Sequence, residues 1–151
     1  MKILLATDGT KYSEAALEIV AKLNLETASE IKIITVVDMA VPLTVDVYAG
    51  YLSSTAEIEK AAREHAFKIL EETQAKLTSR FADKTVTITA EVLFGSPESR
   101  IVETAEQMNA ELIVVGSHGY NRWERLLLGS VSDSVVHHAP CSVLVVRTPK
   151  I

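Results

Sequence analysis

Four short segments dominated by aliphatic residues recur along the chain and predict buried strands. They are ILLA at 3–6, IKIITVV at 31–37, LIVV at 112–115 and VLVV at 143–146. Aliphatic runs of this kind are typical of parallel strands that helices cover on both faces. A fifth segment, VTITAEVL at 86–93, alternates apolar and polar residues and therefore predicts an edge strand with one wetter face.

Helical periodicity fills the segments between these strands. Apolar residues recur at three- and four-residue spacing over 13–23, over 54–81 and after Ser96, and a shorter helix is expected over 130–138. The sequence Ser96-Pro97-Glu98 is typical of a helix start. The stripe expected to face inward from the longest helix is Ile58, Ala61, Ala62, Ala66, Ile69, Leu70 and Leu77. The alternation of strands and helices predicts an α/β fold with an open, doubly wound parallel sheet.

Length and charge narrow the class of protein. A chain of 151 residues is expected to form one domain over 1–151. Its net charge of −5 and the absence of a Lys/Arg run argue against binding to nucleic acid or to anionic membranes. It has one cysteine, Cys141, and no apolar run long enough for a membrane span or a signal peptide, so a cytoplasmic protein is expected.

The segment Asp38 to Ser53 is too long for an ordinary connection between a strand and a helix. Either a lid or partner-contact loop, or an ordinary surface loop, would account for its length.

Candidate binding residues follow the predicted strands. In open α/β sheets, ligands bind beyond the carboxyl ends of the strands. Thr7 and Asp8 follow the first strand, Val37 ends the second, and the fourth leads into Gly116-Ser117-His118-Gly119. The sequence therefore predicts that these segments converge on one ligand.

The last predicted helix adds a second half to this site. Its start, Gly129-Ser130-Val131-Ser132, offers free N–H groups and the positive end of the helix dipole, which attract phosphate. Ser130 is expected to be the N-cap, with Asp133 completing a capping box. Arg122 lies between the two halves and could add positive charge.

Several nucleotide and phosphate motifs are absent. The stretch GSHGYNRWERLLLGSVS contains neither GxxxxGK[ST] nor GxGxxG, so it is neither a P-loop nor a dinucleotide fingerprint. ATDGT is not the SGG-type loop of an ATP pyrophosphatase. Asp8 stands alone after the first strand, which argues against a phospho-receiver domain.

The glycine spacing nevertheless resembles a known signature. Gly116-x-x-Gly119, nine residues and Gly129-Ser130 match the G-2x-G-9x-G-(S/T) pattern of the ATP-binding branch of the universal stress protein family. ATDGTKYSEAAL, GSPESRIVETAEQMNAELIVVGSHG and SVLVVR are also similar to segments of that family, so the resemblance covers essentially the whole chain.

The resemblance implies a fold and a set of residue roles. The sheet order would be 3-2-1-4-5, and ATP would bind with Mg²⁺ or Mn²⁺. Thr7, Asp8 and Val37 would hold adenine and ribose. The residues expected to wrap the phosphates are Gly116, Ser117, His118 and Gly119 together with Gly129, Ser130, Val131 and Ser132.

The resemblance also implies a regulatory, stress-response role and a homodimer through the last strand, Val143–Val146, whose aliphatic edge would otherwise be exposed. A protein partner is expected but not identified by the sequence. A slow ATPase and a nucleotide-free dimeric scaffold remain alternatives, and AMP, ADP or a cyclic nucleotide could occupy the same adenine pocket. The sequence identifies no catalytic residue and no metal ligand.

Overall fold

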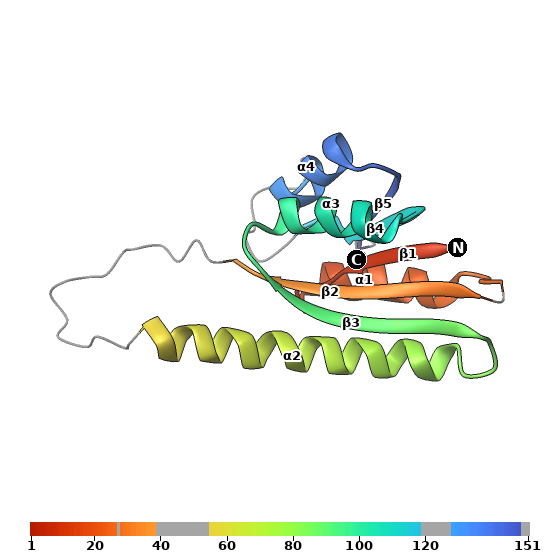
Figure 1. Ribbon diagram of the computed structural model, residues 1–151, viewed down its shortest axis with the longest axis horizontal. Coiled ribbons are helices and arrows are strands. Elements are labelled where there is room, and N and C mark those ends of the chain that lie inside the picture. The colour runs from red at the N-terminus through yellow and green to blue at the C-terminus, as the bar shows by residue number, and fades with distance from the viewer. Residues whose placement is uncertain (27, 39–54, 119–127, 149–151) are drawn as a thin grey trace, which may run out of the picture.

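Strands and helices alternate along the chain as the sequence predicts. The computed structural model describes residues 1–26, 28–38, 55–118 and 128–148. Within these ranges the elements are β1 (Lys2–Ala6), α1 (Lys11–Lys22), β2 (Ser29–Val37), α2 (Thr55–Arg80), β3 (Val86–Phe94), α3 (Pro97–Met108), β4 (Leu112–Gly116), α4 (Ser130–His138) and β5 (Ser142–Val146) (Figure 1). Among the described residues, no helix is both long enough and apolar enough to cross a membrane.

The strands form one parallel sheet in the order β3-β2-β1-β4-β5. This confirms the predicted α/β fold and strand order. The central strand β1 pairs on one side with β2, where Ile3 lies opposite Ile31, and on the other with β4, where Ile3 lies opposite Leu112. Because all strands run the same way, the segments after β1, β2 and β4 meet at one edge of the sheet.

Alternating side chains of the strands build two cores, one on each face. Ile3 and Leu5 belong to the core beneath α1 and α2, whereas Leu4 belongs to the core beneath α3 and α4. All three side chains are fully buried. Helices therefore cover both faces of the central strands, which explains why these strands are aliphatic on both sides.

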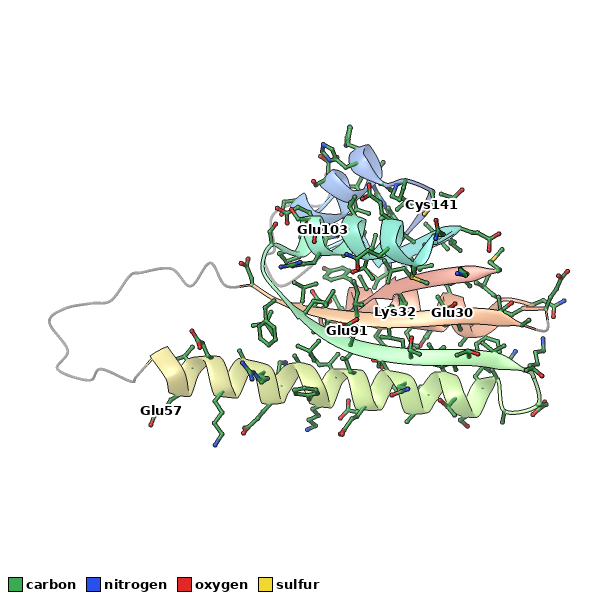
Figure 2. All side chains as sticks on the ribbon, in the orientation of Figure 1. Glu30, Lys32, Glu57, Glu91, Glu103 and Cys141 are labelled. Carbon is green, nitrogen blue, oxygen red and sulfur yellow. The ribbon has the colours of Figure 1, made fainter. Side chains whose placement is uncertain are left out.

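The polar side chains that alternate along β3 lie on a part of the sheet that is open to solvent. Lys32 on β2 and Glu91 on β3 extend from the sheet where α3 and α4 leave it uncovered (Figure 2), and Lys32 Nζ lies 2.7 Å from Glu91 Oε2. β3 is an edge strand whose side chains alternate between half-buried and exposed over most of its length. The edge position predicted from its alternating pattern is thus confirmed.

The first turns of α2 differ from the prediction. Ile58 and Ala61 were expected to face the core, but Ile58 is 48% exposed and Ala61 is also exposed. Figure 1 shows the N-terminal end of α2 extending past the carboxyl edge of the sheet, so no strand lies beneath it. Further along the same stripe, Ala66, Leu70 and Leu77 are buried as expected.

Candidate functional site

A cavity of about 660 Å³ lies at the carboxyl edge of the sheet. Its walls come from the ends of β1, β2 and β4 and from α2, α3 and the start of α4. This volume is within the range of small-molecule and cofactor sites. A second groove, of about 410 Å³, lies between α2 and β3, away from the converging strand ends.

The turn after β1 is held by its own hydroxyl and carboxylate groups. Thr10 is the N-cap of α1 and accepts a hydrogen bond from the Ser13 N–H at 3.4 Å. Asp8 Oδ1 accepts from the Thr10 N–H at 3.0 Å and from the Thr10 hydroxyl at 2.6 Å. The Thr7 hydroxyl donates to Ser13 Oγ at 3.1 Å. Thr7 and Asp8 are therefore fixed at the cavity wall before any ligand arrives.

The end of β4 packs directly against the backbone of the first turn of α1. A Cβ atom at Gly116 would lie 2.7 Å from the carbonyl carbon of Tyr12 and 2.9 Å from the nitrogen of Ser13. The Tyr12 and His118 rings also meet, with their centroids 5.1 Å apart. Only a glycine at position 116 lets the segments after β1 and β4 approach this closely.

The two glycine-containing halves of the predicted phosphate site are joined at Ser117. The Gly129 N–H donates to the Ser117 carbonyl at 2.8 Å, and the Ser132 hydroxyl lies 3.1 Å from the same oxygen. Ser117 is itself anchored, because its N–H donates to the Val146 carbonyl at 2.9 Å. The Ser132 hydroxyl thus connects the two halves, and Ser132 and Ser117 are both buried.

The cap of α4 differs from the predicted capping box. Gly129, not Ser130, is the N-cap, and no side chain caps the helix. The Gly129 carbonyl accepts the first helical hydrogen bond, from the Asp133 N–H at 2.9 Å. The N–H groups of Ser130, Val131 and Ser132 have no intrahelical partner in this geometry. The prediction failed by one residue, and the result is a helix start that no side chain blocks.

Asp133 does not face the start of α4. Its Oδ1 lies 3.9 Å from Nδ1 of His137, one turn toward the C-terminal end of the helix. His137 and His138 occupy the last turn of α4, where protonated imidazoles interact favourably with the helix dipole. The negative charge of Asp133 is therefore directed away from the anion-binding end.

The side of the cavity formed by β2 and α2 is mainly apolar. Val36 and Val37 line it at the end of β2, and Ala62, Ala66 and Ile69 line it from α2. The Val37 carbonyl accepts from the Gly95 N–H at 3.1 Å, which fixes the end of β2 against β3. An apolar wall next to backbone polar groups suits a flat heterocyclic ring.

The cavity wall is acidic where charged side chains reach it. Asp8, Asp38 and Glu98 line it together with His65 and His118, and among the described lining residues there is no Lys or Arg. The described ranges contain no cluster of three or more His, Cys, Asp or Glu side chains that could hold a metal ion. An anion bound here would therefore rely on backbone N–H groups, the helix dipole and an accompanying cation.

Glu98 has a pKa below its usual value. The main cause is a hydrogen bond from the Ser96 hydroxyl, and a backbone hydrogen bond adds to it. Ser96 occupies the N-cap position of α3 as predicted, but its hydroxyl hydrogen-bonds the Glu98 carboxylate and does not cap the helix. Glu98 is thus held ionised at the edge of the cavity.

We expect Ser96→Ala to raise the pKa of Glu98 toward its ordinary value, because the strongest stabilising contact of the carboxylate is lost. A lowered folded-state pKa stabilises the fold above the ordinary value near 4.5, and this contribution is lost as the pH falls through the folded-state pKa. NMR titration of the Glu98 carboxyl carbon measures the change. An unchanged pKa in the variant would show that the Ser96 hydroxyl does not act on this group.

Most of the residues predicted for the site line this one cavity. They are Thr7, Asp8, Val37, Gly116, His118, Gly129, Ser130, Val131 and Ser132. Ser117 lies behind the wall, where it joins the two halves, and Gly119 and Arg122 lie outside the described residues. Most of the predicted loop 38–53 also lies outside them.

Sequence reasoning missed the part of the wall that comes from helices and from within β2. These residues include Ser13, Thr35, Ala62, His65, Ala66, Ile69 and Glu98. The stripe of small side chains on α2 was a usable signal, because it leaves room between the helix and the end of β2. As a sequence pattern alone, it predicts only a core-facing stripe.

Comparison with known proteins gives a consistent result over the whole chain. The sequence model of the universal stress protein family matches residues 1–147. A curated protein of Staphylococcus aureus (strain USA300) that carries the same family name is 33% identical over 150 residues, which is 99% of this chain and 85% of that protein.

Solved structures of similar fold extend this comparison. The universal stress protein UspA from Lactobacillus plantarum is 27% identical, with a TM-score of 0.75 and 97% of each chain covered. A family protein from Arabidopsis thaliana, solved with AMP bound, shares the fold at 17% identity and a TM-score of 0.70, with 99% of this chain and 92% of that chain covered. Another, solved in complex with cAMP, shares it at 20% identity and a TM-score of 0.66, with 99% and 98% covered.

Proposed function

This chain belongs to the universal stress protein family, and from that premise we propose that it is a nucleotide-binding regulatory protein whose ligand is ATP. ATP would lie at the carboxyl edge of the sheet, with its phosphates at the start of α4 and its base between β2 and α2. Occupancy would act as a conformational switch or as a structural support for a protein partner in a stress response.

One observation carries the proposal: the uncapped start of α4 is fixed against the end of β4. The Gly129 N–H and the Ser132 hydroxyl both reach the Ser117 carbonyl, which places Gly116 and His118 beside the first turn of α4. Free N–H groups at a helix start, with no side-chain cap and with Asp133 directed away, form an anion site. Its place beside an apolar slot supports a ligand with a phosphate chain and a ring.

The relatives support an adenine nucleotide. Proteins of the same fold hold AMP and cAMP. The start of α4 provides donors beyond those needed for a single phosphate, which favours a triphosphate in this chain. Three carboxylates on the wall and the negative net charge favour ATP that arrives with a divalent cation, Mg²⁺ or Mn²⁺.

The direct test is to denature the purified protein and identify any released nucleotide by chromatography. Calorimetric titration of nucleotide-free protein with ATP, ADP, AMP and cAMP, with and without Mg²⁺, then ranks the ligands. We expect ATP with Mg²⁺ to bind most tightly. No released nucleotide and no heat of binding would favour the nucleotide-free scaffold, whereas conversion of bound ATP to ADP in a single turnover would favour the slow ATPase.

We also propose that the protein is a homodimer through β5. This edge strand is entirely aliphatic over Val143–Val146, and three of these four side chains are only half-buried in the single chain. An apolar edge strand promotes pairing with another strand. Two copies that pair along β5 would remove this edge from water.

We expect Val143→Lys to convert the dimer largely to monomer, because it places a charge against the apolar edge of the partner. Sedimentation velocity at several concentrations measures the change, and circular dichroism checks the fold. Phe67→Lys is the matched control, because Phe67 is 52% exposed on α2, near the opposite edge of the sheet. A wild-type protein that sediments as a 16.5 kDa monomer at all concentrations would contradict the dimer.

A further inference from the structure

Thr35 on β2 has a buried hydroxyl without a hydrogen-bond partner among the described residues. Its side chain is 5% exposed. The other buried polar side chains of the described chain all make a hydrogen bond: Thr7, Ser13, Ser29, Thr73, Thr104, Ser117 and Ser132. Thr35 is therefore the exception in a fold that otherwise satisfies its buried hydroxyls.

An unpaired buried hydroxyl is unfavourable for folding, because the group loses its hydrogen bonds to water and gains none. Valine has almost the same shape and also favours strands, so it would fill this position without that cost. A hydroxyl at a position where a methyl group would be more stable suggests that it meets a polar group that comes from outside the chain.

The position of Thr35 indicates what that group is. Thr35 lines the cavity with Val36 and Val37, facing a wall that α2 forms with Ala66 and Ile69. The start of α4 belongs to the other side of the cavity, and β1 lies between β2 and β4 in the sheet. Thr35 is thus a buried polar group in the mainly apolar part of the wall, and the central strand separates its strand from β4 at the anion-binding end. A few placed polar groups in a mainly apolar site fix the orientation of a ligand.

We propose that the Thr35 hydroxyl hydrogen-bonds a ring nitrogen or exocyclic group on the polar edge of a purine base and so selects the base. This rests on the proposed function, because it assigns a further contact to the same nucleotide site. The hydroxyl oxygen is hidden from solvent, and rotation between staggered χ1 positions, which lie about 120° apart, can turn it toward the ring.

The test combines two variants of Thr35 with two ligands. Calorimetry measures binding of ATP and of inorganic tripolyphosphate, which has no base. We expect Thr35→Val to weaken ATP binding by about fivefold to a hundredfold, and to leave tripolyphosphate binding unchanged. Thr35→Ser keeps the hydroxyl and should retain most of the ATP affinity.

Thermal melting of the nucleotide-free protein adds a second measurement. If Thr35 served only packing, Thr35→Val would lower the melting temperature, whereas the inference expects it to rise. We expect Thr35→Val to melt about 2–4 °C higher than the wild type, because the unpaired hydroxyl is gone. Thr104→Val is the matched control: its hydroxyl donates to the Arg100 carbonyl at 2.7 Å, so its loss should not raise the melting temperature or change ATP affinity. Higher stability with weaker ATP binding supports the inference.

Three results would overturn it. If wild-type protein binds ATP and Thr35→Val binds it equally well, the hydroxyl is not a base contact, and the proposed function still stands. If Thr35→Val and Thr35→Ser lose ATP affinity equally and both melt lower, Thr35 serves only packing. A wild-type protein that binds no ATP would overturn both this inference and the proposed function.

Discussion

Gly129→Val is expected to weaken ATP binding by about 3 kcal/mol, or roughly a hundredfold, the loss expected when two charge-assisted hydrogen bonds fail. A Cβ at this position would lie 3.2 Å from both the Ser117 carbonyl oxygen and the His118 Cα, and valine adds two methyl groups beyond it. The two halves of the anion site would therefore move apart. Calorimetric titration with ATP and Mg²⁺ measures the loss.

The backbone at Gly129 helps to isolate this effect. Its φ of −60° and ψ of 151° suit any residue, so the substitution introduces crowding without backbone strain. Gly129→Ala should lose less affinity, because it adds only the Cβ. Val136→Ala, on the exposed side of the same helix, should bind ATP like the wild type. Full ATP affinity in Gly129→Val would mean that the phosphates lie elsewhere.

Gly116→Ala is expected to cause the largest loss of stability, about 1–3 kcal/mol as in other overpacked positions. The added Cβ would meet the Tyr12 carbonyl carbon at 2.7 Å and its oxygen at 2.8 Å. These are backbone atoms at the first turn of α1, so no side chain can move aside to relieve the contact. Urea unfolding measures the free energy of unfolding, with Gly129→Ala as the same substitution in a less crowded place.

The contact at Gly116 also predicts that substitutions at the two glycines will affect stability and ATP binding to different extents. Gly116→Ala should lower the midpoint of urea unfolding more than Gly129→Ala, whereas Gly129→Val should affect ATP binding more than stability. Equal stability of Gly116→Ala and the wild type would show that α1 and β4 can separate at this point without cost, and that the close approach does not support the fold.

The elements of the fold could be predicted from the sequence because their signal is local. Aliphatic runs located the strands to within two residues, and the alternating pattern of β3 identified an edge strand. The exposure of Ile58 and Ala61 could not be predicted this way. Periodicity identifies which face of a helix is apolar. It does not show how far the sheet extends beneath that helix, because this depends on the tertiary structure.

The candidate site was predictable only in part, for a similar reason. Glycine spacing and strand ends identified residues on the backbone side of the cavity, including Gly116 and Gly129. Thr35 is unremarkable in sequence as one residue of a strand, and only its unpaired hydroxyl in the fold distinguishes it. The cap of α4 was misplaced by one residue because the carbonyl that starts the helix belongs to a glycine, which has no side chain to mark it.

The central position of β1 has a consequence for how the chain is made. β1 is synthesised before both of its neighbours in the sheet, and one of them, β4, follows more than a hundred residues later, where Leu112 pairs with Ile3. Until then, one edge of the central strand has no partner in its own chain. Pairings between residues that are distant in sequence form slowly. Until they form, incomplete chains expose unpaired strand edges that are prone to aggregation. The cavity needs both the turn after β1 and the start of α4, so it can form only after α4 has been synthesised, and a ligand there would hold together two segments that lie more than a hundred residues apart.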